Sequence, residues 1–211
     1  MDGMWKSFYI LLVILVVVIL RVASVSAAEN DRRNLDIILL FDHSYSMFEN
    51  NDARMYEAQV ATVKFIDQLD PAYDKVSLIR FSEYAEVQKP LGTPFEDVKS
   101  KIDSYHMDRF SKFTNMQKAI MKAEEELSIH GRLDADKIII LLSDGEINRP
   151  RLNGREDLSY ARSVALKEAV AAASSKITIH TISIGRGNVD QELLEAIASR
   201  TGGKNYIAVS P

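Results

Sequence analysis

The sequence predicts an α/β fold in which a doubly wound, mostly parallel sheet carries helices on both faces and one short antiparallel edge strand. Continuous apolar runs such as Ile37–Phe41 and Ile138–Leu142 are typical of parallel strands that are buried on both faces. Helical segments alternate with these runs along the chain, which implies right-handed crossovers between parallel strands. Apolar residues make up 46% of the 211 residues, ample for one core.

Each element follows from a local pattern of apolar residues and turn residues. We expect strands at 35–42, 75–82, 85–89, 137–143, 177–184 and 204–209. We expect helices at 52–69, 95–104, 115–130, 156–174 and 190–200. Only Glu83 and Tyr84 separate the second strand from the 85–89 strand, so this pair is expected to form an antiparallel hairpin at the edge.

Charge and cysteine content exclude several classes of function. The net charge of -4 gives no basic face for nucleic acid, so we expect no nucleic-acid partner. The chain has no cysteine, which excludes disulfides, thiolate zinc sites and cysteine nucleophiles.

The N-terminal segment is predicted to be a targeting sequence. Lys6 precedes an apolar run from Phe8 to Leu20, and small residues end the segment near Ala28. As a helix the run would span roughly 20 Å, short of the ~30 Å of a bilayer core. Residues 1–27 are therefore expected to be a signal peptide, or alternatively an N-terminal membrane anchor. Either way, a domain at 30–211 would face outward, secreted or in the cell envelope, touching the membrane only through an uncleaved segment.

Three separated segments supply oxygen ligands of the kind that a hard divalent cation prefers. Asp42, Ser44 and Ser46 follow the first expected strand, Thr114 opens a helix, and Asp144 follows a later strand. Ligands bind beyond the carboxyl ends of the strands in open α/β sheets. Oxygen-only ligation selects Mg²⁺, Mn²⁺ or Ca²⁺ over zinc or copper. We therefore predict a metal site made of these groups on a solvent-facing rim.

Each ligand candidate also has an ordinary structural explanation. Asp42 or Ser44 is suited to capping the next helix. Thr114 with Gln117 is typical of a capping box, and Asp144 with the glycine after it is a common turn pair. Their joint occurrence at the ends of core strands favours the metal site.

The pattern Asp42-x-Ser44-x-Ser46, followed by Thr114 and then by Asp144-Gly, resembles the metal-ion-dependent adhesion site of von Willebrand factor type A domains. The resemblance covers residues 35 to 210. It implies an intact adhesion site with Mg²⁺, or Mn²⁺ or Ca²⁺, in which both aspartates act largely through water. It further implies an open coordination position for the carboxylate of a protein ligand.

Some residues depart from the family pattern. Tyr45 stands where the family often has glycine, and Phe113 lies in a position of a usual Gly-Gly pair. With Phe48 and Phe110 these aromatic residues are expected to form a rim beside the ion, or alternatively to pack into the core. His43 is not expected to be a ligand. The family usually adds one more helix after the last strand, which we expect to be missing here, either because the chain is a fragment or because a partner covers that face.

The sequence supports other classes of function less well. Phosphoaspartyl transferases place a second aspartate two residues after the first, where this chain has Ser44. No Gly-x-Ser-x-Gly elbow or phosphate-binding loop occurs, so we do not expect an enzyme. The leading hypothesis is a metal-dependent adhesion or interaction module that binds a protein ligand. The alternative is a structural or assembly subunit of an envelope complex.

Overall fold

The computed structural model of the protein describes residues 32–108, 112–144, 147–184 and 190–208, apart from the side chains of residues 49–53 and 208. The predicted signal peptide or anchor at 1–27 lies outside this part of the chain. Within the described part, no helix has both the length and the apolar character needed to span a membrane.

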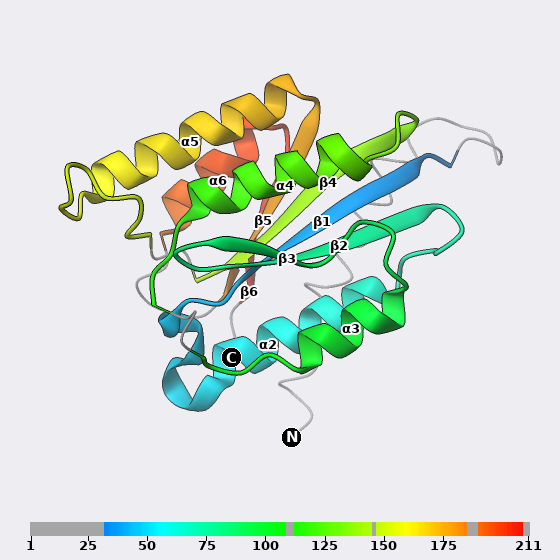
Figure 1. Ribbon diagram of the computed structural model, residues 1–211, viewed down its shortest axis with the longest axis horizontal. Coiled ribbons are helices and arrows are strands. Elements are labelled where there is room, and N and C mark those ends of the chain that lie inside the picture. The colour runs from blue at the N-terminus through cyan, green and yellow to red at the C-terminus, as the bar shows by residue number, and fades with distance from the viewer. Residues whose placement is uncertain (1–31, 109–111, 145–146, 185–189, 209–211) are drawn as a thin grey trace.

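A six-stranded sheet forms the middle layer of the molecule (Figure 1). Its strands are β1 (Asn34–Asp42), β2 (Asp74–Phe81), β3 (Ala85–Lys89), β4 (Ala135–Ser143), β5 (Ile177–Ile184) and β6 (Asn205–Ala208). Their order in the sheet is β3-β2-β1-β4-β5-β6, and every pair is parallel except β2 and β3. The predicted fold class is confirmed, including its antiparallel edge strand.

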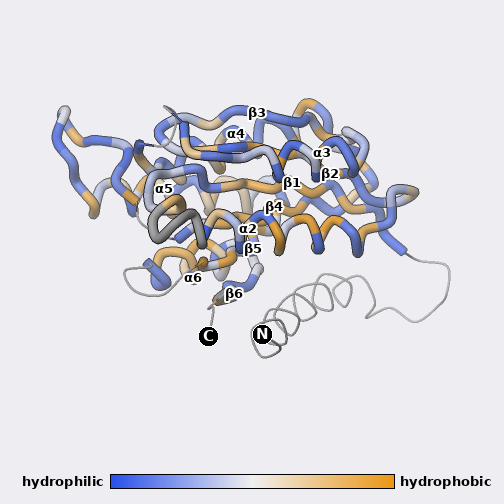
Figure 2. Tube along the Cα trace, turned by 90° about the horizontal axis from the view of Figure 1, so that it is seen from below, coloured by the Kyte–Doolittle hydropathy of each residue, from blue (hydrophilic) through white to orange (hydrophobic). Residues whose placement is uncertain are grey.

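Helices cover both faces of the sheet (Figure 1). One face carries α2 (Glu49–Ile66) and α3 (Phe95–Asp103); the other carries α4 (Met116–His130), α5 (Leu158–Ser174) and α6 (Gln191–Arg200). Hydrophobic and hydrophilic segments alternate along the helices in Figure 2, as expected when one side of each helix faces the sheet.

The start of α2 differs from the sequence-based expectation. The helix spans 49–66 instead of 52–69, and an unpredicted 3-10 helix, η1 (Tyr45–Phe48), precedes it. Met47 and Phe48 are buried in the core, so packing sets the position of this turn. Because Phe48 occupies the N-cap position and no side chain caps the helix, the expected capping role of Asp42 or Ser44 is wrong.

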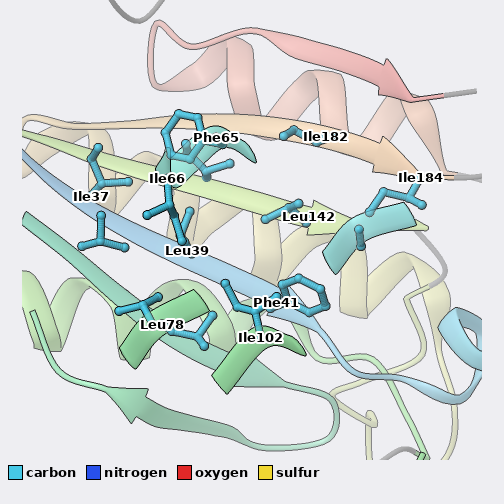
Figure 3. Packing of buried hydrophobic residues seen from close by; sticks show 14 of the residues in the cluster. Ile37, Leu39, Phe41, Phe65, Ile66, Leu78, Ile102, Leu142, Ile182 and Ile184 are labelled. Atoms are coloured by element: carbon cyan, nitrogen blue, oxygen red, sulfur yellow. The ribbon is translucent and has the colours of Figure 1, made fainter. Parts of the chain in front are cut away.

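β1 lies at the centre of the core. Ile37, Leu39 and Phe41 pack toward α2 and α3 (Figure 3). Ile38 and Leu40 pack toward the opposite helices. All five side chains are fully buried. Burial of an aliphatic side chain of this size stabilises a fold by about 1.5–3 kcal/mol. Both faces of β1 are therefore packed against apolar layers, while its pairing with β2 and β4 defines its register.

At the amino end of β1, Asp36 and Arg132 tie three segments together. Asp36 is fully buried and accepts hydrogen bonds from the Arg132 backbone N–H and from its Nε, the latter at 2.9 Å. Nη2 of Arg132 donates to the carbonyls of Leu35 at 2.9 Å and Tyr73 at 2.8 Å. This end of the sheet is therefore closed by a buried ion pair.

Arg132→Ala is expected to destabilise the fold by about 2–3 kcal/mol, because it leaves a buried carboxylate without its guanidinium. Urea denaturation would measure the change. Arg33→Ala is the matched control: Arg33 pairs with Asp136 on the surface at 3.2 Å, and its loss should cost less than about 1 kcal/mol. Equal effects of the two substitutions would contradict the structural role of the buried pair.

Candidate metal centre

Asp42 ends β1 at the carboxyl edge of the sheet, and neutral donors hold its carboxylate. The Ser44 backbone N–H donates to Oδ1 at 2.8 Å, and the Ser143 hydroxyl of β4 donates to Oδ2. Asp42 is fully buried, and its burial together with the nearby charge of Asp144 raises its pKa to about 7, although the serine donors act in the opposite direction. A cation placed here would relieve both the burial of this charge and the repulsion from Asp144.

The two predicted serine ligands lie side by side. The Oγ atoms of Ser44 and Ser46 are 3.1 Å apart and share a hydrogen bond. Ser46 belongs to η1, so a helical turn brings the two hydroxyls together.

Thr114 is held by the loop that follows β4. Its backbone N–H donates to Oδ1 of Asn148 at 3.0 Å, and its carbonyl accepts from the backbone N–H groups of Asn148 at 3.3 Å and Arg149 at 3.1 Å. The alternative explanation, in which Thr114 and Gln117 form a capping box, is wrong, because Asn115 caps α4 by accepting from the Lys118 N–H at 3.1 Å. Thr114 is therefore not used as a helix cap.

Arg149 fastens the same loop to the Thr114 segment. Its guanidinium carbon lies 3.4 Å from the centre of the Phe113 ring, and Nη1 pairs with Glu156 at 2.8 Å. Neither Arg149 nor Asn148 stood out in the sequence, because their partners are known only once the loops are folded.

Arg54 reaches the site from α2. Its Nη1 donates to Oδ2 of Asp144 at 3.1 Å and to the carbonyl of Ser46 at 3.1 Å. This contact joins the loops after β1 and β4, and no local pattern in the sequence predicts it.

The predicted ligands are almost completely buried, which corrects the expectation of a solvent-facing rim. None of the five is more than 9% exposed; they are Asp42, Ser44, Ser46, Thr114 and Asp144. The donors are two carboxylates and three hydroxyls, a set that suits a hard divalent cation. No three Asp, Glu, His or Cys side chains gather as a metal cluster in the described part of the chain, so the fit depends on the hydroxyls.

The predicted aromatic rim is only partly present. Tyr45 is 56% exposed beside the site, but Phe48 is buried in the core and Phe113 lies under Arg149. Phe110 lies outside the described residues. Tyr84, which was not predicted, is equally exposed and stacks with Lys118 at 4.3 Å.

His43 turns to the opposite side of its loop from the serine hydroxyls. Its ring packs edge-on against Phe48 and Tyr105, with centroid distances of 4.9 and 5.2 Å. Burial, aided by the positive charge of Arg80, lowers the pKa of His43 to about 4, so the ring is neutral at pH 7.

Comparison with known proteins identifies the family. The sequence model of the von Willebrand factor type A domain matches residues 36–210. The chain belongs to this family. Human collagen alpha-1(XXI) chain is 27% identical over 218 residues, which cover 97% of this chain and 21% of the collagen. This von Willebrand factor type A domain thus spans about a fifth of the length of the curated relatives it matches.

Solved structures share the fold. An aerotolerance-related membrane protein from Bacteroides fragilis has a TM-score of 0.70 at 18% identity and covers 83% of this chain and 92% of its own. Proximal thread matrix protein 1 from the mussel byssus, described with a zinc-occupied MIDAS motif, has a TM-score of 0.67 at 21% identity. That match covers 84% of this chain and 43% of the mussel protein.

The free energy of unfolding of the Asp42→Asn variant is expected to increase relative to that of the wild type as pH rises. The pKa of Asp42 is about 7 in the fold and 3.8 ordinarily, so the folded protein binds more protons between these values and loses stability as pH rises through them. Asparagine does not titrate. In EDTA, urea denaturation at pH 4.5 and pH 8 should show the difference between variant and wild type growing by about 1 kcal/mol or more. A constant difference would contradict the raised pKa.

Proposed function

We propose that this domain is an outward-facing interaction module that binds a protein partner through a divalent cation. Asp42, Ser44, Ser46, Thr114 and Asp144 would hold the ion, and the ion would offer an electrophilic position to an anionic oxygen of the partner. The observation that carries the proposal is the meeting of these loops at one edge of the sheet: the Ser44 and Ser46 hydroxyls are 3.1 Å apart, Arg54 links Ser46 to Asp144, and Asn148 holds Thr114.

Charge supports a carboxylate as the partner group. The hydroxyl donors add no formal charge, and the two aspartates would only partly neutralise a dication if they act through water. The open position would then favour an anion over a water molecule, more strongly so because the site is buried. Exposed Tyr45 and Tyr84 supply aromatic contact area, a common feature of protein interfaces. The proposal contains no catalytic step.

An outward location is part of the same proposal. It rests on the apolar run from Phe8 to Leu20 and on relatives whose names describe a collagen, a byssal matrix protein and a membrane protein. The collagen and the byssal matrix protein also favour a second candidate, a permanent structural or assembly subunit. The lifetime of the complex separates the two candidates, because a transient adhesion module should release its partner on removal of the metal.

Calorimetry is expected to detect one divalent site of micromolar-to-millimolar affinity, occupied by Mg²⁺ or Mn²⁺. Thr114→Ala should weaken binding more than tenfold, because it removes a donor hydroxyl. Thr93→Ala is the matched control, since the Thr93 hydroxyl donates to the nearby Pro90 carbonyl in an exposed turn. Titration with Zn²⁺ and Ca²⁺ would rank the ions. Unchanged binding by Thr114→Ala would remove that residue from the site.

Partner binding is expected to depend on the ion. The partner would be captured on the immobilised domain in Mg²⁺ and released in EDTA, with a Thr114→Ala column as control. Its exposed Asp and Glu residues would then be changed to Ala, and one of these changes should remove most of the affinity. If EDTA leaves the affinity within about twofold (~0.4 kcal/mol), the cation is not the bridge to the partner.

A further inference from the structure

Arg54 places a fixed positive charge on the proposed metal ligands. Nη1 donates at 3.1 Å to Oδ2 of Asp144 and at 3.1 Å to the carbonyl of Ser46. The Arg54 side chain is 18% exposed, and the Asp144 side chain is 1% exposed. A guanidinium carries a full positive charge and several N–H donors in one plane, which suits contact with a carboxylate.

The contact between Arg54 and Asp144 offsets the charge of one of two buried acids that repel each other. Asp42 and Asp144 are both buried, and the charge of Asp144 is felt at Asp42. The hydrogen bonds to Asp42 come from neutral groups of Ser44 and Ser143. Arg54 is therefore a cation that stabilises the Asp144 carboxylate in the absence of a metal ion.

We infer that Arg54 is a built-in counter-cation that competes with the divalent ion and sets the affinity of the site. This inference rests on the proposed function, because it assigns a role toward the same metal site. The guanidinium and a dication need the same Asp144 carboxylate, and two positive charges that share it repel each other. Anything that stabilises the metal-free state more than the bound state lowers the affinity by the same free energy.

Displacement of Arg54 is structurally simple. Its contacts lie at the end of a long, flexible side chain that already has an outlet to solvent. When the ion takes Asp144, the guanidinium can turn outward while α2 stays in place. The affinity is thereby adjusted so that the ion binds only where free divalent cation is abundant.

Arg54→Gln tests the competition. Glutamine removes the charge and keeps an amide donor for the Ser46 carbonyl. Calorimetry with Mg²⁺ should show at least about tenfold tighter binding than in the wild type, equivalent to ~1.4 kcal/mol. The melting temperature in EDTA should fall, since Asp144 loses its cation. Arg33→Gln is the control, because Arg33 lies near the other end of β1 in an exposed pair with Asp136. This variant should keep the Mg²⁺ affinity and the melting temperature of the wild type within error.

The outcomes separate this inference from the proposed function. If the wild type binds Mg²⁺ and Arg54→Gln binds it equally or more weakly, the competition is overturned and the metal site stands. If neither protein binds Mg²⁺, Mn²⁺, Ca²⁺ or Zn²⁺, the proposed function fails together with the inference.

A measurement on the unmodified protein provides independent evidence if the variant does not fold. Phenylglyoxal labels accessible guanidinium groups, and peptide mass spectrometry reports the labelling rate of each arginine. Saturating Mg²⁺ should speed the labelling of Arg54 severalfold over EDTA and leave Arg33 unchanged. Labelling of Arg54 that stays slow in Mg²⁺ would show that the ion does not displace it, and would overturn the inference.

Discussion

The parallel pairing of β1 with both β2 and β4 is the constraint on which the candidate site depends. β1 pairs with β2 from Leu35 to Asp42 and with β4 from Asn34 to Phe41, so all three strands end at one edge. A shift of one residue would exchange the side chains that face the two cores and move Asp36 and Asp42 away from their hydrogen-bond partners. The position of the candidate ligands therefore depends on the pairing along the whole of β1.

Backbone hydrogen bonds also hold the loops at the carboxyl edge in fixed positions relative to the strands. The His43 N–H donates to the Phe81 carbonyl at 2.8 Å, and the Asn115 N–H donates to the Ser82 carbonyl at 2.7 Å. Asn148 completes the set by pairing with Thr114. These bonds join neutral groups, and the charged contacts of Arg149 with Glu156 and of Arg54 with Asp144 add to them.

The sequence was sufficient to predict the sheet, and it singled out candidate ligands whose role stays a prediction, but it did not identify the residues that surround them. Strands could be predicted because apolar runs such as Ile37–Phe41 depend only on local order. The contacts of Asn148 with Thr114 and of Arg54 with Asp144 join residues 34 and 90 positions apart, and no local pattern encodes such distances. The failed capping box has a similar cause, since Asn115 is an equally good cap beside Thr114.

The two ends of the sheet neutralise their acids differently, and this difference favours a cation site at only one of them. At the amino end, Asp36 pairs with Arg132 and Asp74 pairs with Arg32 at 2.8 Å, so each buried acid has its own guanidinium. At the carboxyl end, Arg54 contacts Asp144, and Asp42 is bonded by neutral donors. Within the described part of the chain, the hydrogen bonds to Asp42 come from serine groups, which add no formal charge. A divalent cation would supply positive charge beside Asp42, so the same β1 strand has a closed ion pair at one end and a candidate binding site at the other.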